Sequence, residues 1–133
     1  MDDKLSLFRY RIEKAENDLQ SAEILFSNNF YAQSLNRSYY SIFHSVRALF
    51  AFEGLDSKRH SGVIAIFNKE FVHKKLIPVE YYAILKTAER IRSDCDYDDF
   101  YIASKQQAEG QFENAKRFLN YIKEFISQNY FPN

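Results

Sequence analysis

Apolar side chains recur every three or four residues along residues 3–26. An α-helix turns once every ~3.6 residues, so this spacing places them on one face and predicts a long amphipathic helix. The expected inner face consists of Leu5, Phe8, Ile12, Ala15, Leu19, Ala22 and Phe26. Asp2 and Asp3 stand near its start, where the helix dipole favours negative charge. The polar residues 27–29 predict a turn after it.

A second helix is expected over residues 30–52, ending before Gly54, because glycine commonly terminates helices. This segment contains no Asp or Glu, and the only side chains in it that are charged or that titrate near neutral pH are Arg37, His44 and Arg47. Apolar and aromatic residues occupy nearly all of its sides. A helix that is apolar all round belongs in the middle of a bundle, so we expect this helix to be central.

Three more helices are predicted downstream. One covers residues 57–71, and Pro78 suits the first turn of the next, which is followed by an acidic loop at residues 93–99. Their inner faces are expected to hold Val63, Ile66 and Phe67, and then Tyr82, Leu85 and Ile91. The last helix begins near Ser104, because Ser104 and Gln107 match a capping box. Its apolar positions are Ala108, Phe112, Ala115, Leu119, Ile122 and Ile126.

Composition agrees with an all-α fold in one domain, residues 1–133. The chain has only 3 Gly and 2 Pro, which favours long helices over many turns. Lys and Arg number 18, as do Asp and Glu, so any attraction to nucleic acid has to come from a local patch. One cysteine, Cys95, cannot form an internal disulfide. Without a secretory signal or an apolar stretch of ~20 residues, we expect a cytoplasmic protein that does not enter membranes.

The second helix carries a candidate phosphodiester site. Arg37 and His44 are two turns apart, so they project from one face at ~10 Å along the axis. Ser41 and Ala48 are small side chains near the same line that leave room for an approaching group, and Arg47 lies one turn beyond His44. A guanidinium offers a fork of donors to phosphate oxygens, and an imidazole exchanges protons near neutral pH.

A structural interpretation competes with this one. Arg37 would be a buried charge paired with a carboxylate from residues 94–99, and His44 would be a core histidine bonded to a neighbouring helix. Residue types alone favour the structural interpretation, because paired ionic groups perturb one another without any chemistry.

The segment from Asn36 to His44, NRSYYSIFH, resembles the Arg-x(4–6)-His signature of HEPN domains. Downstream, HSGV at residues 60–63 and Arg92 ahead of the Asp96-Tyr97 pair resemble further elements of the small stand-alone HEPN proteins. The resemblance implies an up-and-down helical bundle that commonly forms a homodimer and brings two Arg/His motifs to one cleft. Many HEPN proteins are metal-independent endoribonucleases, and many are toxins neutralised by a nucleotidyltransferase-type partner.

Transferred to this chain, the resemblance makes His44 the general acid or base and Arg37 the group that stabilises charge on the attacked phosphate of RNA, with a 2′,3′-cyclic phosphate as product. Ser38 departs from the Asn, Asp or His that often follows the arginine in active members. Val46 stands where some toxins carry a tyrosine that the partner modifies. Two alternatives therefore stay open: a non-catalytic module that binds nucleotide and pairs with a nucleotidyltransferase, and a purely structural dimer.

Neighbouring side chains complete the predicted site. His60, at the start of the third helix, extends the phosphate surface or belongs to a solvated basic turn. The full set of expected ligand-binding residues is Ser38, Tyr40, Ser41, Arg47 and His60, with Tyr40 able to stack on a base.

The acidic residues 94–99 do not match a calcium loop, since Asp99 stands where such a loop needs glycine. Asp96 is expected instead to form a structural ion pair with Arg92, with Tyr97 packing over the bundle. No nucleotide-binding glycine loop or CxxC motif occurs, so we expect neither a cofactor nor a metal.

Overall fold

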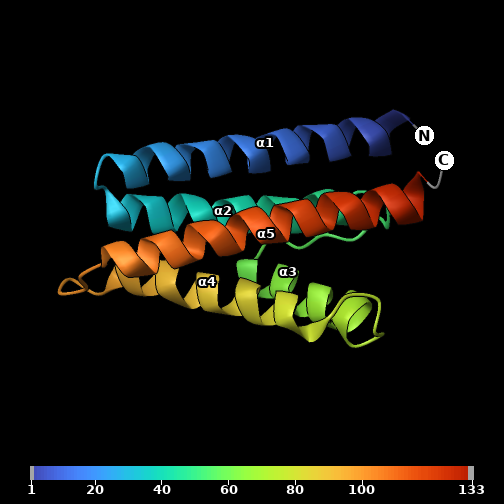
Figure 1. Ribbon diagram of the computed structural model, residues 1–133. Helices are drawn as coiled ribbons and strands as arrows, with labels where there is room; N and C mark the ends of the chain where they lie inside the picture. The colour runs from blue at the N-terminus through green and yellow to red at the C-terminus, as the bar shows by residue number, and fades with distance from the viewer. Residues whose placement is uncertain (1, 132–133) are drawn as a thin grey trace.

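The computed structural model describes residues 2–131. Its regular secondary structure is all helical, with no strand in that range. The elements are α1 (Asp2–Ser27), α2 (Tyr31–Phe50), α3 (His60–Phe67), the π-helical turn η1 (Asn68–Val72), α4 (Val79–Tyr97) and α5 (Lys105–Tyr130). The four long helices alternate in direction along the bundle, and the two ends of the chain lie at the same end of it (Figure 1). The predicted all-α, up-and-down bundle of about five helices is confirmed.

Helix α2 lies at the centre, in contact with α1, α3, α4 and α5. Its large side chains, including Tyr39, Ile42 and Phe50, are fully buried in the main core. Two serines on its α1 side are also buried and donate hydrogen bonds to the backbone of α1. Ser34 Oγ bonds the carbonyl of Ala22 at 2.8 Å, and Ser41 Oγ bonds that of Ala15 at 2.8 Å. The small side chains on this face therefore let α1 pack closely against α2. The space that the sequence suggested for a ligand at Ser41 is filled by α1.

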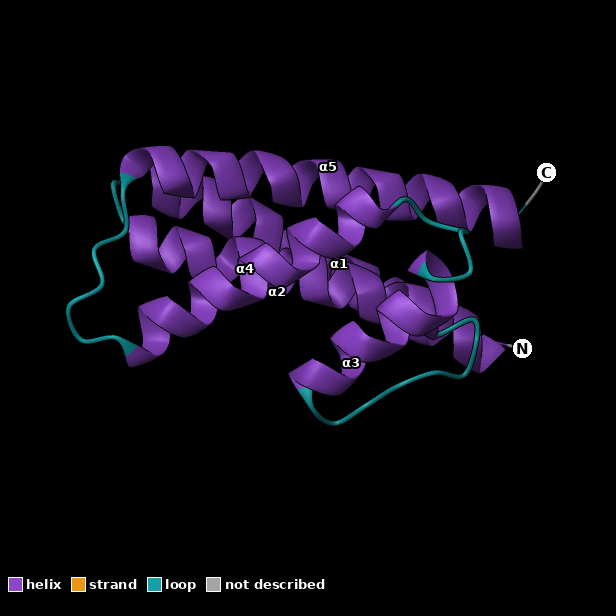
Figure 2. Cartoon of the chain, turned by 90° about the horizontal axis from the view of Figure 1, so that it is seen from below, coloured by secondary structure: helices purple, strands orange, loops and turns teal. Residues whose placement is uncertain are grey.

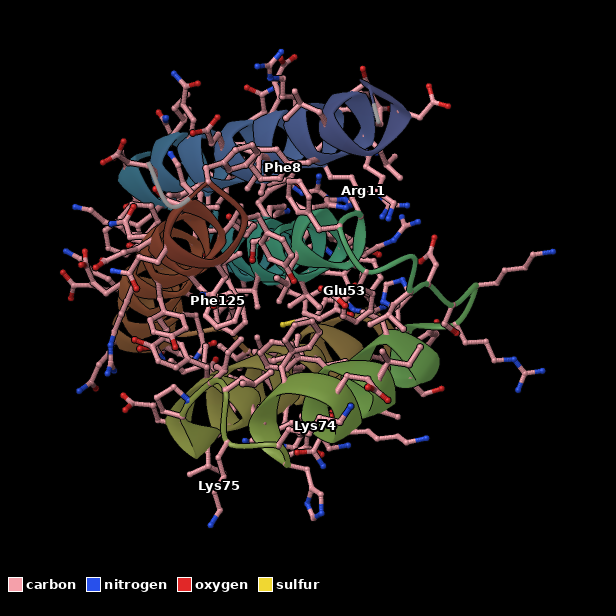
Figure 3. The ribbon with its side chains drawn as sticks, turned by 90° about the vertical axis from the view of Figure 1, so that its right-hand side faces the viewer. Phe8, Arg11, Glu53, Lys74, Lys75 and Phe125 are labelled. Carbon is pink, nitrogen blue, oxygen red and sulfur yellow. The ribbon has the colours of Figure 1, made fainter. Side chains whose placement is uncertain are left out.

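A buried arginine of α1 forms hydrogen bonds to the end of α2 and to the segment after it. Arg11 is only 8% exposed and points from α1 toward the segment that follows α2 (Figure 3). It donates one hydrogen bond to the carbonyl of Arg47 at 2.8 Å and a second to the carboxylate of Asp56 at 3.1 Å. Asp56 also accepts two hydrogen bonds from the Arg47 guanidinium, at 3.2 and 2.9 Å. One carboxylate thus joins α1, α2 and the connection to α3.

The end of α4 differs from the prediction. Residues 93–97 continue the helix, and the loop to α5 comprises residues 98–104, which bulge from one end of the bundle (Figure 2). Arg92 stabilises this last turn, because its guanidinium lies 3.3 Å from Asp96 one turn later. Cys95 packs against the small cluster of Leu35, Ile91 and Ala108. Tyr97 is 80% exposed, so the expectation that it packs over the bundle is wrong.

The other helix ends depart less from the expectation. Helix α3 starts at His60, three residues later than expected. Pro78 is the residue just before α4, so it precedes the first turn in which it was expected. Ser104 caps α5 by accepting a hydrogen bond from the backbone N–H of Gln107 at 3.0 Å. The Gln107 side chain does not complete the capping box in return, because it accepts a hydrogen bond from Tyr101.

Gly62 has a packing role in α3. A Cβ at this position would overlap the side chain of Ser57, which covers the first turn of the helix. We expect Gly62→Ala to lower the free energy of unfolding by about 1–3 kcal/mol, because a crowded site has to shift. Gly110 in α5 has open space around it, so Gly110→Ala should raise stability by about 0.5–1 kcal/mol.

Urea denaturation of both variants measures the two effects. The double variant Gly62→Ala/Ser57→Gly provides the control, since it removes the side chain that the new methyl group would meet. A Gly62→Ala variant as stable as Gly110→Ala would contradict this account of α3.

Candidate functional site

Arg37 and His44 both face a carboxylate that the sequence analysis did not single out. Asp18 of α1 accepts a hydrogen bond from Arg37 Nη1 at its Oδ1, at 2.9 Å. Its other oxygen, Oδ2, lies 3.8 Å from His44 Nε2. The expected partner of Arg37 in residues 94–99 is therefore replaced by a residue of α1. The side chains of His44 and Asp18 are 12% and 14% exposed, whereas that of Arg37 is 37% exposed.

Two further contacts hold the Arg37 guanidinium. The side-chain oxygen of Asn36 accepts hydrogen bonds from Nε at 3.2 Å and from Nη2 at 2.7 Å. The guanidinium also lies over the ring of Tyr40, 5.0 Å from its centroid, at a distance that suits a cation–π contact. Arg37 is thus oriented by α2 itself, and Asp18 occupies only part of its donor set.

His44 is poor in polar partners. Its Nδ1 is buried and has no hydrogen-bond partner among the described residues. Burial lowers the pKa of His44 to about 4, and the positive charges of Lys14, Arg47, Arg37 and Arg11 act in the same direction. Burial also raises the pKa of Asp18, although the charge and hydrogen bond of Arg37 and the charge of Lys14 oppose that rise. At neutral pH, His44 is therefore uncharged and available only as a proton acceptor.

His60 belongs to an aromatic cluster, in contrast to the solvated basic turn that the sequence left open. Its ring stacks on Phe43 with centroids 4.2 Å apart, and its Nδ1 lies 2.6 Å from the hydroxyl of Tyr39. Tyr40 meets the His60 ring edge-on at 5.8 Å. Burial lowers the pKa of His60, and the charge of Arg92 adds to the effect. The cluster connects α3 to the same part of α2 that carries His44.

Arg92 joins α4 to this cluster. Its guanidinium lies over Tyr39 at 4.9 Å and over Tyr40 at 5.9 Å from the ring centroids. Besides Asp96 it contacts Glu89 at 3.2 Å, and its side chain is 12% exposed. Arg92 therefore packs against the tyrosines of α2 and links α4 to them.

Hollows open at both ends of this stretch of α2. One of about 510 Å³ is lined by Phe43, Arg47, Asp56, Ser57, Lys58 and His60. Another of about 400 Å³ is lined by Leu25, Ala32, Gln33, Asn36, Arg37, Cys95 and Asp96. Arg37 and Arg47 thus each border an open hollow. Ser38 and Ser41, by contrast, are 1% and 0% exposed and cannot contact a ligand in this conformation.

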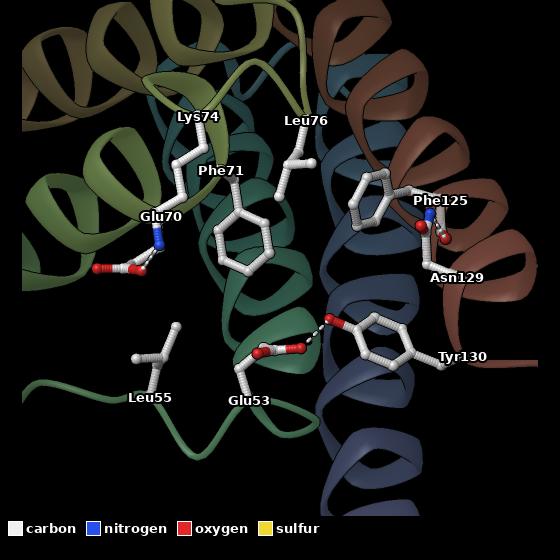
Figure 4. A pocket seen from close by; sticks show the side chains of 9 residues that line it. All are labelled: Glu53, Leu55, Glu70, Phe71, Lys74, Leu76, Phe125, Asn129 and Tyr130. Carbon is white, nitrogen blue, oxygen red and sulfur yellow. Dashed lines mark hydrogen bonds and ion pairs between the residues drawn. The ribbon is translucent and has the colours of Figure 1, made fainter.

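A third hollow, of about 340 Å³, lies between η1, the segment after α2 and the end of α5 (Figure 4). Its polar side chains satisfy one another. Tyr130 donates a hydrogen bond to Glu53 at 2.5 Å, and Lys74 forms an ion pair with Glu70 at 2.7 Å. None of the predicted site residues lines it.

No three His, Cys, Asp or Glu side chains within residues 2–131 converge closely enough to hold a metal ion. No helix in the same range is long and apolar enough to cross a membrane.

Comparison with known proteins places the chain. Two proteins of Methanocaldococcus jannaschii, each named "Putative toxin", are 37% identical over 115 residues and 35% identical over 117 residues. The first alignment covers 86% of this chain and 78% of the relative, and the second covers 88% and 87%. The crystal structure of an archaeal HEPN homologue has the same fold, with a TM-score of 0.67 at 22% identity, covering 90% of this chain and 97% of that one. The profile of the HEPN domain matches residues 8–125, and the chain therefore belongs to the HEPN family.

Proposed function

We propose that this protein is a metal-independent endoribonuclease of the HEPN type that acts as a toxin component. The observation that carries the proposal is that Arg37 and His44 face one and the same anionic group, the carboxylate of Asp18, at 2.9 and 3.8 Å. The names of the two Methanocaldococcus jannaschii relatives support the toxin role. The open hollows beside Arg37 and Arg47 provide space for the strand on either side of a bound phosphate.

In this mechanism each side chain has one task. Arg37 donates hydrogen bonds to the non-bridging oxygens of a phosphodiester and stabilises the charge that builds on them. Neutral His44 takes the proton of the ribose 2′-hydroxyl through Nε2, because its Nδ1 is buried. The 2′-oxygen then bonds to phosphorus, and the bond from phosphorus to the 5′-oxygen breaks. The products are a 2′,3′-cyclic phosphate and a 5′-hydroxyl end.

The leaving 5′-oxygen needs a proton, and His60, the other histidine near this part of α2, is engaged with the Tyr39 hydroxyl through its Nδ1. A homodimer that brings two copies of the motif to one cleft would supply it from the second His44, because the phosphate charge raises the pKa of a nearby imidazole. We also propose a nucleotidyltransferase-type antitoxin as the partner, as the HEPN resemblance implies. The partner's regulation does not include modification two residues after His44, since that residue is Val46.

A second candidate function is a non-catalytic module that binds a nucleotide and interacts with a nucleotidyltransferase. The low exposure of His44, at 12%, favours it, because a mostly buried imidazole is hard for a ribose hydroxyl to reach. Arg37, Arg47 and Tyr40 would still hold a phosphate and a base in that case.

Labelled single-stranded RNA incubated with purified protein tests the proposal. We expect wild-type protein to cleave it in the presence of EDTA, and His44→Ala and Arg37→Ala each to slow cleavage by about 100-fold or more, because each removes a group that acts in the transition state. Lys105→Ala, an exposed change at the start of α5, is the matched control and should keep wild-type activity. Intact RNA with folded wild-type protein, at concentrations where the protein is dimeric, would refute the nuclease function.

The protonation of His44 gives a separate prediction on stability. The pKa of His44 is about 4 in the folded chain, against an ordinary value of 6.5 for histidine. The unfolded chain therefore binds a proton more readily, and stability is lost as the pH falls from 6.5 toward 4. Between pH 7 and pH 5 this loss should amount to about 2 kcal/mol. His44→Gln removes it, so the variant should show a flatter pH dependence in urea denaturation. His60 titrates in both proteins and cancels in the comparison. Parallel pH profiles would show that His44 is not desolvated.

A further inference from the structure

Asp18 lies between Arg37 and His44, at the position where the proposed mechanism binds a phosphate. Its two oxygens face the Arg37 guanidinium at 2.9 Å and the His44 imidazole at 3.8 Å. We propose that Asp18 is an intramolecular competitor for the anion site between Arg37 and His44, and that a phosphate group displaces it when RNA binds. This inference rests on the proposed function and assigns to that site a residue that limits its affinity.

The shape of the two anions makes the exchange possible. A carboxylate and a phosphodiester both present two oxygens that share one negative charge, and a guanidinium binds either through the same donors. Arg37 does not need Asp18 for its orientation, because Asn36 and Tyr40 hold it from the same helix. Displacement of Asp18 therefore leaves a guanidinium that is already in place for the phosphate.

The distances do not support the other role that an aspartate beside a histidine commonly has. An orienting carboxylate accepts a hydrogen bond from the ring nitrogen that does not react, within about 3.2 Å. In this chain that nitrogen, Nδ1, is buried without a partner, and Asp18 lies near Nε2, the nitrogen needed for catalysis. Asp18 thus covers the reactive edge of His44 and does not position it.

A displaced Asp18 also has another charge to approach. Lys14 lies one turn earlier on α1, and its positive charge already acts on the Asp18 carboxylate. Asp18 is 14% exposed and Lys14 is exposed, so a rotation of Asp18 toward Lys14 would bring its carboxylate closer to solvent. The free energy cost of breaking its contact with Arg37 is therefore reduced by better solvation of the carboxylate.

The test measures binding of a single-stranded RNA in which every 2′-hydroxyl is methylated, so that it keeps its phosphates and cannot be cleaved. Fluorescence anisotropy at fixed salt compares wild type with Asp18→Asn. We expect the variant to bind about tenfold more tightly, because a charge-assisted contact no longer competes for Arg37. Glu13→Gln is the matched control: it removes the same charge from an exposed position of α1, and it should change the affinity by less than about twofold.

The double variant Asp18→Asn/Arg37→Ala locates the effect. The gain from Asp18→Asn should disappear in it, because the phosphate then lacks the group that Asp18 blocked. Thermal unfolding verifies that each variant is folded, and Asp18→Ser replaces Asp18→Asn if the asparagine variant is not. A gain that Glu13→Gln reproduces, a gain that survives in the double variant, or no binding by wild type and Asp18→Asn alike overturns the inference.

Cleavage assays separate this inference from the proposed function. For an RNA that wild type cleaves, Asp18→Asn should lower KM about tenfold and leave kcat within about threefold, whereas a residue that positions His44 would lower kcat. Cleavage by wild type with unchanged binding in Asp18→Asn refutes the competitor role and leaves the nuclease intact. Tighter binding by Asp18→Asn without any cleavage refutes the nuclease and leaves an anion site that Asp18 blocks.

Discussion

The burial of α2 on nearly all of its sides is the constraint on which the rest of this structure depends. A buried polar group is costly unless it is paired, and α2 carries no acidic residue of its own. Several of its polar side chains therefore find partners on other elements. Ser34 and Ser41 bond the backbone of α1, Arg37 pairs with Asp18, and Arg47 pairs with Asp56. The packing of α1 on α2 and the electrostatics of the site have this common origin.

The same constraint shapes the chemistry that the site can perform. His44 lies among positive charges in a partly dry position, so its imidazole is neutral and its pKa is about 4. A neutral imidazole beside a guanidinium suits proton abstraction near a bound phosphate. In the free chain the carboxylate of Asp18 faces both groups. The low exposure of His44 goes together with the packing of α1 on this face of α2.

Three separate parts of the sequence that resemble HEPN elements meet around two tyrosines. Tyr39 and Tyr40 of α2 contact His60 at the start of α3 and Arg92 of α4. The contacts are aromatic stacking and cation–π interactions, which fix rings and guanidinium groups relative to one another. The cluster therefore holds α2, α3 and α4 in a constant relation on the side of α2 that carries the candidate site. Its member His60 also lines the hollow beside Arg47.

The sequence by itself determined the class of the fold, the central place of α2 and the common face of Arg37 and His44, because helical periodicity and the absence of acidic residues are local properties. Local patterns did not determine that residues 93–97 are helical, since the stretch is rich in Asp and its support comes from Arg92 and from packing of Cys95. They also did not reveal Arg11 and Asp18. Both lie on the inner face of α1 beside Ala15 and Ala22, and a charged residue on an inner face indicates a buried partner on another element. Only the tertiary structure decided which charge meets which. The partner of Arg37 is on another helix, and the rotation of α1 about its axis and the closeness of its approach to the serines of α2 set the distance between the two charged groups.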